Sequence, residues 1–137
     1  MKKMIVIQGP TNHGKTLTLI KVYGILREKC GEVVDYFPDE YDIRVILHDV
    51  NGLKVGICSQ GDPNSRQKED LKCLVQEGCD IIFCAARTSG MTVENIQAYE
   101  EIYDITFVPQ PFVEGDDSMQ EQSNEKMARE LIALAGL

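Results

Sequence analysis

The sequence has no tryptophan, no Cys-x-x-Cys pair and only two histidines among its 137 residues. Its five cysteines are an odd, scattered set without the ligand spacing of a zinc site. Two of them, Cys58 and Cys84, lie in apolar strand-like runs, where a free thiol behaves as a small core residue. We therefore expect the cysteines to have a structural role.

Long hydrophobic runs are also absent. No segment approaches the roughly 20 consecutive apolar residues that a membrane-spanning helix needs. The chain begins with Met-Lys-Lys, but the apolar run behind it, Met4–Ile7, is short and no small-residue cleavage site follows. The sequence therefore predicts a cytoplasmic protein without a signal peptide.

The chain lacks a basic patch as well. Its 14 Lys and Arg are dispersed among 22 Asp and Glu, which gives a formal net charge of −8. A protein of this charge repels the phosphates of nucleic acids and of anionic membranes. We therefore expect neither nucleic acid nor a membrane surface as a partner. Any phosphate ligand has to be held by local geometry.

What the sequence does contain is a set of buried strands alternating with helical patterns. Met4–Ile7 and Asp80–Ala86 are continuous apolar runs, typical of parallel strands that are covered on both faces. Ile105–Val108 predicts a last strand, which Pro109 stops. Helices are expected over residues 15–30, 63–78, 93–103 and, after Ser118, near the end of the chain.

Two further strands are expected to form a hairpin. Ile43–His48 and Leu53–Cys58 flank the dipeptide Asn51-Gly52, and both turn residues accept the positive φ of a tight turn. These strands are therefore expected to be antiparallel neighbours. The preceding segment, Val33–Asp42, mixes aromatic residues, proline and acids, and is interpreted as a loop.

The resulting order, β–α–β–β–α–β–α–β–α, predicts one α/β domain over residues 1–137. We expect a three-layer α/β/α sandwich with a mostly parallel sheet of about five strands and one antiparallel hairpin pair. Ligands in such folds bind at the carboxyl ends of the strands. Three polar loops are expected to meet there: Gln8–Thr16, Ser59–Pro63 and Arg87–Thr92.

The first of these loops matches the phosphate-binding pattern GxxxxGK[ST] at every position, whereas the dinucleotide pattern GxGxxG is absent. A loop of this length between strand and helix turns backbone N–H groups inward around an anion, and the helix N-terminus adds partial positive charge. Lys15 can reach the β- and γ-phosphates, and the Thr16 hydroxyl can bind Mg²⁺. The predicted nucleotide-binding residues are Gly9, Pro10, Thr11, Asn12, His13, Gly14, Lys15, Thr16 and Leu17. The alternative is a glycine-rich turn that binds nothing, or that holds only phosphate or sulfate.

This motif and its strand–helix context resemble the Walker A region of P-loop nucleoside triphosphatases over Met4–Leu26. Asn12-x-Gly14-Lys15 is similar to the NxGK[ST] variant common in GTPases that work on ribosomes and RNA. The resemblance implies a nucleoside triphosphate and Mg²⁺ as ligands. Two GTPase features are missing, since Cys58 stands where the Asp of DxxG is expected and Val108–Pro111 stands where NKxD is expected. The choice between ATP and GTP stays open.

Phosphoryl transfer also needs a carboxylate for the hydrated metal and a group that stabilises charge. Asp62 is the candidate acid and second metal ligand after Thr16, with a helix N-cap before Pro63 as the alternative. Arg87 is the candidate contact to the γ-phosphate, with a surface arginine as the alternative. Gln60 could orient a water or simply meet solvent. Asp35, Asp39 and Glu40 are further acids that could contact Mg²⁺ or an acceptor.

These patterns predict a small P-loop protein that binds ATP or GTP with Mg²⁺ and hydrolyses or transfers the γ-phosphate. Lys15, Asp62 and Arg87 are its expected catalytic residues, and Thr16 and Asp62 its expected metal ligands. The alternative is a non-catalytic switch that reports the state of the nucleotide to a partner protein. The oligomeric state is not indicated by the sequence.

Overall fold

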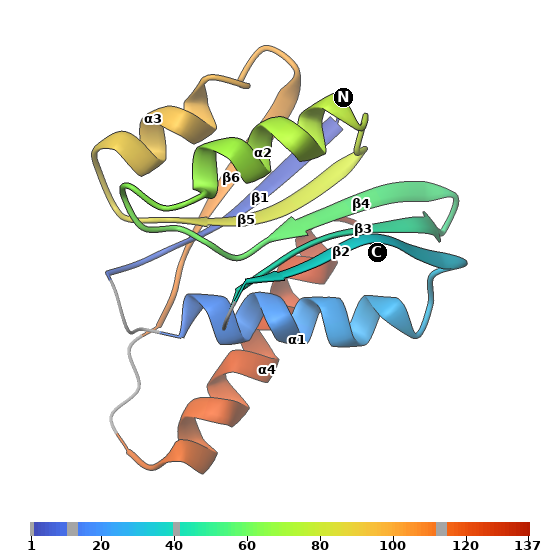
Figure 1. The fold of residues 1–137 in the computed structure, drawn as a ribbon. Coiled ribbons are helices and arrows are strands. Elements are labelled where there is room, and N and C mark those ends of the chain that lie inside the picture. Colours follow the sequence, from blue (N-terminus) through green and yellow to red (C-terminus); the bar gives the residue numbers. More distant parts are fainter. Residues whose placement is uncertain (1, 11–13, 40–41, 112–114) are drawn as a thin grey trace.

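The computed structural model describes residues 2–10, 14–39, 42–111 and 115–137, and for residues 35–39 it describes the backbone alone. Within these ranges the chain forms a single mixed sheet of six strands with four helices, which confirms the predicted α/β class (Figure 1). The elements are β1 Lys2–Gln8, α1 Lys15–Arg27, β2 Glu32–Asp39, β3 Asp42–Val50, β4 Leu53–Cys58, α2 Gln67–Gln76, β5 Ile81–Ala86, α3 Met91–Gln97, β6 Tyr103–Pro109 and α4 Asp117–Leu134.

The parallel part of the sheet follows from the apolar runs. The strand order is β2-β3-β4-β5-β1-β6, and β4, β5, β1 and β6 pair in parallel. Every residue of β5 is buried, as are Met4–Ile7 in β1, because helices cover both faces of these strands. Helices α1 and α4 lie on one face and α2 and α3 on the other (Figure 1), which is the predicted three-layer sandwich.

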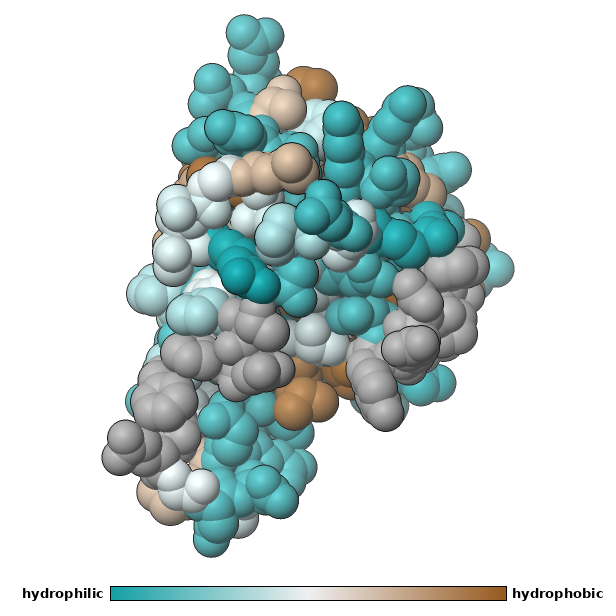
Figure 2. Space-filling view, turned by 60° about the vertical axis from the view of Figure 1, so that its left-hand side comes forward, coloured by the Kyte–Doolittle hydropathy of each residue, from teal (hydrophilic) through white to brown (hydrophobic). Residues whose placement is uncertain are grey.

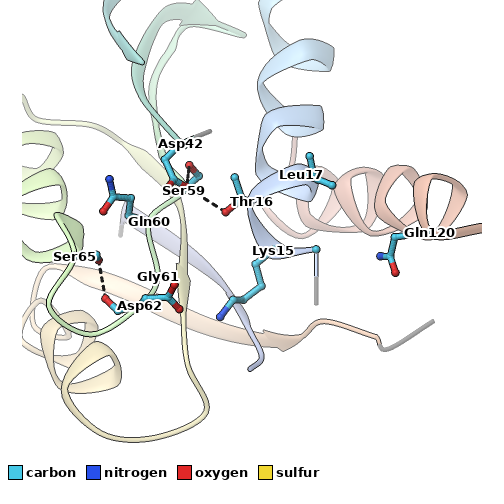
Figure 3. A pocket seen from close by; sticks show the side chains of 11 residues that line it. Lys15, Thr16, Leu17, Asp42, Ser59, Gln60, Gly61, Asp62, Ser65 and Gln120 are labelled. Atoms are coloured by element: carbon cyan, nitrogen blue, oxygen red, sulfur yellow. Dashed lines mark hydrogen bonds between the residues drawn. The ribbon is translucent and has the colours of Figure 1, made fainter. Parts of the chain in front are cut away.

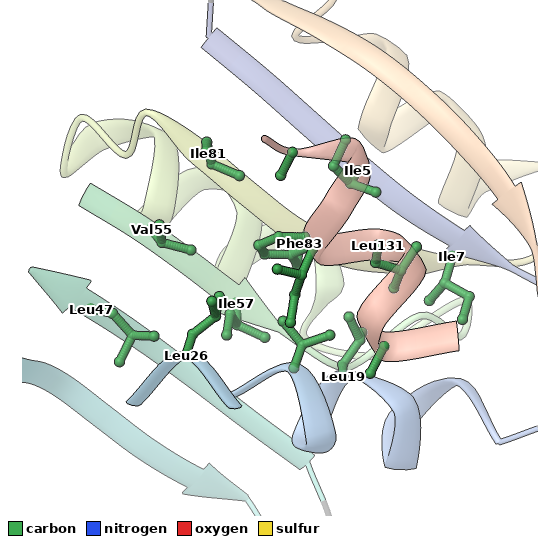
Figure 4. Packing of buried hydrophobic residues seen from close by; sticks show 14 of the residues in the cluster. Ile5, Ile7, Leu19, Leu26, Leu47, Val55, Ile57, Ile81, Phe83 and Leu131 are labelled. Atoms are coloured by element: carbon green, nitrogen blue, oxygen red, sulfur yellow. The ribbon is translucent and has the colours of Figure 1, made fainter. Parts of the chain in front are cut away.

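The larger apolar cluster joins the sheet to α1 and α4. Figure 4 shows side chains of β1, β3, β4 and β5 meeting Leu19 and Leu26 of α1 and Leu131 of α4. Phe83, at the centre of this view, is fully buried. A second cluster packs α2 and α3 against the opposite face. This packing fixes the strand ends that carry the polar loops.

The predicted hairpin is confirmed. Asn51 and Gly52 both have positive φ, 53° and 83°, and Val50 pairs with Leu53 across the turn. These are the backbone angles that the Asn-Gly dipeptide adopts at low cost. Strands β3 and β4 are antiparallel, so β3 runs opposite to β4, β5, β1 and β6.

The interpretation of Val33–Asp42 as a loop is wrong. Residues 32–39 form β2, the sixth strand, which pairs antiparallel with β3 at the edge of the sheet, from Glu32 opposite His48 to Asp39 opposite Asp42. An edge strand needs hydrogen bonds on one side only, so it tolerates the proline and acids that argued against a strand. The register shift between Val34 and Phe37 marks an irregularity in this pairing.

The second helix also begins later than predicted, at Gln67, with Arg66 as its N-cap; Asp62 does not have that role. The Ser65 hydroxyl donates to the Asp62 carbonyl at 2.6 Å, and the Gln60 side chain accepts from the Arg66 N–H at 2.8 Å. These side-chain bonds stabilise a turn where a first helical turn was expected. Asp62 is therefore left in a loop.

The other helix ends differ in smaller ways. The first helix stops at Arg27, α3 spans only Met91–Gln97, and Asp116 caps α4 by accepting from the Met119 N–H at 3.0 Å. Over the ranges described, the helices are all too short or too polar to cross a membrane.

Candidate functional site

The amino end of α1, where the predicted phosphate loop ends, borders a cavity of about 380 Å³ at the carboxyl edge of the sheet. This edge comes forward in Figure 2, where most of the coloured residues are hydrophilic. Figure 3 shows the side chains around the cavity, which come from α1, from the start of β3, from the segment after β4 and from α4. The lining residues are Gly14, Lys15, Thr16, Leu17, Asp42, Ser59, Gln60, Gly61, Asp62, Ser65 and Gln120.

Gly14 places the amino end of α1 at this cavity. Its φ of 87° is in the left-handed region, and a Cβ atom there would lie 2.8 Å from Asn124 Oδ1 and 2.9 Å from Gln120 Nε2. Both the backbone angle and the close neighbours therefore require glycine. The first helical hydrogen bond runs from Thr18 N to Gly14 O at 2.9 Å. The N–H groups of residues 15–17, which come before Thr18, have no partner within the helix, so they are available to an anion.

Lys15 is a buried cation held by backbone carbonyls. Its side chain is only 7% exposed, and Nζ donates to the carbonyl of Gly9 and, at 3.4 Å, to that of Ala86. Burial lowers the pKa of Lys15; Asp62 acts against this shift, and Arg87 adds to it. An anion in the cavity would stabilise the charged form of the lysine.

A carboxylate that the sequence analysis missed lies beside the phosphate loop. The Thr16 hydroxyl donates to Asp42 Oδ1 at 3.1 Å, and the Ser59 hydroxyl donates to the same oxygen at 2.9 Å. Ser59 is buried and also accepts from the Ile43 N–H at 2.8 Å, so it fixes the start of β3 against the end of β4. The carboxylate of Asp42 is thus held at the hydroxyl predicted to bind metal.

Asp42 could have been found from the predicted hairpin. An antiparallel neighbour of β4 begins at the edge where β4 ends, so an acid at the start of that strand belongs to the ligand edge. Interpreting residues 33–42 as a loop concealed this relation, because the first residue of β3 was counted with the loop.

Asp62 and Arg87, both predicted from the sequence, form an ion pair across two loops. Arg87 Nε lies 3.2 Å from Asp62 Oδ1, with 40% and 50% of the two side chains exposed. Asp62 lines the cavity and acts electrostatically on Lys15. The structure therefore brings the three predicted catalytic residues together. The hydrogen-bond partner of the Thr16 hydroxyl is Asp42, however, whereas Asp62 pairs with Arg87.

The loop that carries Asp62 is packed tightly against β5. A Cβ atom on Gly61 would lie 2.7 Å from the Ala85 Cβ and 2.8 Å from its carbonyl carbon. Gln67 donates to the carbonyls of Ala85 and Thr92 at 3.0 Å each, and Thr92 accepts from the Arg87 N–H at 2.9 Å. Close packing and these hydrogen bonds thus fix the backbone of the two loops that carry Asp62 and Arg87.

Six of the residues named from the sequence fall wholly or partly outside the described part of the chain. These are Thr11, Asn12, His13 and Glu40, and the side chains of Asp35 and Asp39. Pro10 is described and exposed.

Cys58 and Cys84 are buried free thiols, as expected, and burial raises the pKa of both. Among the described residues, no cluster of three or more His, Cys, Asp or Glu side chains could hold a metal ion.

Comparison with known proteins adds no relative, since no family model, curated protein or solved structure matches the chain.

Proposed function

We propose that this chain is a cytoplasmic P-loop protein that binds ATP or GTP with Mg²⁺ and hydrolyses or transfers the γ-phosphate. The observation that carries the proposal is the hydrogen bond between Thr16 and Asp42, beside the buried cation Lys15 and the amino end of α1. An anion site and an acidic oxygen ligand thus lie next to each other, as binding of a metal–triphosphate requires.

The phosphates would be held by the backbone and Lys15. The N–H groups at the start of α1 carry the partial positive charge of the helix, and Gly14, with its left-handed backbone, begins this helix at the cavity. Lys15 Nζ would exchange the Gly9 and Ala86 carbonyls for phosphate oxygens, which carry full negative charge. Local geometry would thereby overcome the negative charge of the chain.

The donor set suits Mg²⁺. This cation prefers hard oxygen ligands and is usually bound by one or two carboxylates together with substrate phosphates and water. The hydroxyl of Thr16 and the carboxylate of Asp42 supply two such oxygens 3.1 Å apart, and Ser59 orients the carboxylate. When bound, Mg²⁺ neutralises charge on the phosphates. In this proposal Asp42 takes the metal-binding role that the sequence analysis gave to Asp62.

Asp62 and Arg87 would act at the terminal phosphate. Both lie on loops that meet near Lys15, and the positive charge of Arg87 lowers the pKa of that lysine. Arg87 would turn its guanidinium from Asp62 to the phosphate and stabilise the charge that develops in transfer. Asp62 would accept a hydrogen bond from the attacking water or acceptor hydroxyl.

One observation favours the alternative of a nucleotide-dependent switch. Gln60, the candidate for orienting an attacking water, uses its side-chain oxygen to accept the Arg66 N–H at 2.8 Å. This bond stabilises the loop and occupies one of the two lone pairs of that oxygen, which holds Gln60 in place and limits its movement toward a water in the cavity. Tight binding with slow turnover would fit this arrangement.

Thermal unfolding with a panel of nucleotides tests the proposal. ATP or GTP with Mg²⁺ should raise the melting temperature, and Lys15→Ala should abolish the rise because it removes the phosphate contact. Lys29→Ala is the matched control, since Lys29 is an exposed lysine just beyond the far end of α1. No shift with any nucleotide would refute both binding and turnover. A shift without phosphate release would favour the switch.

A further inference from the structure

The two ends of the cavity differ in chemistry. At one end lie the acids Asp42 and Asp62, with Arg87 paired to Asp62. At the other end the lining residues are Leu17 and Gln120, and neither is charged. Figure 3 shows Asp62 and Gln120 on opposite sides of Lys15. A triphosphate with its terminal phosphate near Asp62 and Arg87 would therefore direct its nucleoside toward Leu17 and Gln120.

A buried cluster of polar side chains supports the neutral end. Thr18 of α1, Gln110 after β6 and Asn124 of α4 are all buried, and Gln120 lies one helical turn before Asn124. Asn124 Oδ1 accepts from Gln110 Nε2 at 3.2 Å and from Gln120 Nε2 at 2.9 Å. The Thr18 hydroxyl lies 3.3 Å from both Gln110 Oε1 and Asn124 Oδ1. Buried amides joined in this way hold one another in fixed orientations.

This network fixes the orientation of the Gln120 amide. Asn124 accepts one N–H of the amide nitrogen, and the second N–H and the acceptor Oε1 remain. No hydrogen bond within the described residues uses that oxygen. Leu17, with 55% of its surface exposed, adds an apolar surface at the same end. An apolar contact beside a fixed acceptor suits a flat heterocycle that carries an N–H donor.

We infer that Gln120, oriented by Asn124, recognises an exocyclic amino group on the base of the bound nucleotide. This inference rests on the proposed nucleotide site and names the part of the ligand that the sequence left open. The base would lie against Leu17, and its amino group would donate to Gln120 Oε1. The ligand class is a purine nucleotide with an amino group on its base, recognised by one hydrogen bond from that group to Gln120 Oε1.

The test compares nucleotides that differ by one amino group. Equilibrium binding with Mg²⁺ is measured for ATP against purine riboside triphosphate, which lacks the 6-amino group, and for GTP against inosine triphosphate, which lacks the 2-amino group. For the parent nucleotide that binds more tightly, loss of the amino group should weaken binding about tenfold, because the acceptor Gln120 Oε1 loses its partner. In Gln120→Leu the two members of that pair should bind equally.

Gln122→Leu is the matched control, because Gln122 is exposed on the same helix, and it should keep the tenfold preference. Inorganic triphosphate separates this inference from the function on which it rests. It should bind wild type and Gln120→Leu alike, since it has no base. Equal binding of both pairs by the wild type, or a preference unchanged in Gln120→Leu, would refute base recognition while leaving the phosphate site intact. Failure of every nucleotide and of inorganic triphosphate to bind would refute the nucleotide site as well.

Discussion

The Thr16 hydroxyl donates to Asp42 Oδ1 across 3.1 Å, and this bond joins the start of α1 to the first residue of β3. The two residues are far apart in the chain and meet because β3 runs antiparallel to its neighbour β4. Ser59, directly after the last residue of β4, donates to the same carboxylate oxygen. Three elements thus meet at a single carboxylate.

Asp42→Asn should weaken nucleotide binding in the presence of Mg²⁺ about tenfold or more, because the amide keeps the shape but loses the charge that attracts the cation. Binding measured in EDTA should change little. Asp104→Asn is the control, since Asp104 is an exposed acid on β6, away from the cavity. Titration of each variant with and without Mg²⁺ measures the difference. An equal loss in both conditions would argue against a metal-binding role.

Much of the fold could be predicted because the signals were local. Burial of β5 on both faces follows from its continuous apolar run, and the Asn51-Gly52 turn follows from the backbone angles that these residues tolerate. The edge strand β2 could not be predicted in this way. Its pairing with β3 comes from tertiary contact, which outweighed the poor strand propensity of its proline and acids.

The candidate site also combines residues with a local sequence signal and residues that only tertiary structure brings together. Gly14, Lys15 and Thr16 follow one another in a motif, so their position at the amino end of a helix could be predicted. Asp42 and Gln120 come from distant elements; Asp42 is indicated only by the direction of β3, and Gln120 by no sequence pattern. They are brought to the cavity by the antiparallel direction of β3 and by the packing of α4 against Gly14.

Gly14→Ala should abolish nucleotide binding and lower the free energy of unfolding by about 2 kcal/mol or more, because a positive φ and close contacts both oppose the methyl group. Gly52→Ala separates these causes. Gly52 has a similar φ of 83° but nothing within 4 Å of its added Cβ, so only backbone strain of about 1 kcal/mol is expected there. Urea unfolding and nucleotide titration of both variants provide the measurement. Equal losses of stability would show that the contacts with Asn124 and Gln120 carry no cost.

Gly61→Ala should displace the loop that carries Asp62, because the new Cβ would lie 2.7 Å from the Ala85 Cβ and 2.8 Å from its backbone carbon. We expect a loss of about 1–3 kcal/mol in the free energy of unfolding together with reduced turnover. Gly24→Ala is the matched control within α1, where nothing lies within 4 Å. That change should stabilise the protein by about 0.5–1 kcal/mol, because alanine favours a helix. Chemical unfolding of both variants measures whether the free energy of unfolding falls in Gly61→Ala and rises in Gly24→Ala.

The lowered pKa of Lys15 should make stability depend on pH in alkaline solution. Burial lowers the pKa from the ordinary lysine value of 10.5, so the unfolded chain binds more protons than the folded one between the lowered pKa and 10.5. Stability contributed by this group therefore rises as pH increases through that window and is constant below it. The difference in unfolding free energy between wild type and Lys15→Met should follow this rise. A difference independent of pH would mean that the lysine is not affected by burial.

Arg87→Ala should lower the rate of phosphate release by about tenfold or more while changing nucleotide affinity much less, because its charge is needed most in the transition state. Asp62→Ala should also reduce the rate. The Asp62–Arg87 pair itself should contribute less than about 1 kcal/mol to stability, since both side chains are half-exposed. Steady-state phosphate release, with affinity measured separately, distinguishes the two effects. Release that survives Asp62→Ala but is lost in Lys15→Ala would remove Asp62 from the mechanism and leave it as the partner that holds Arg87 in the absence of ligand.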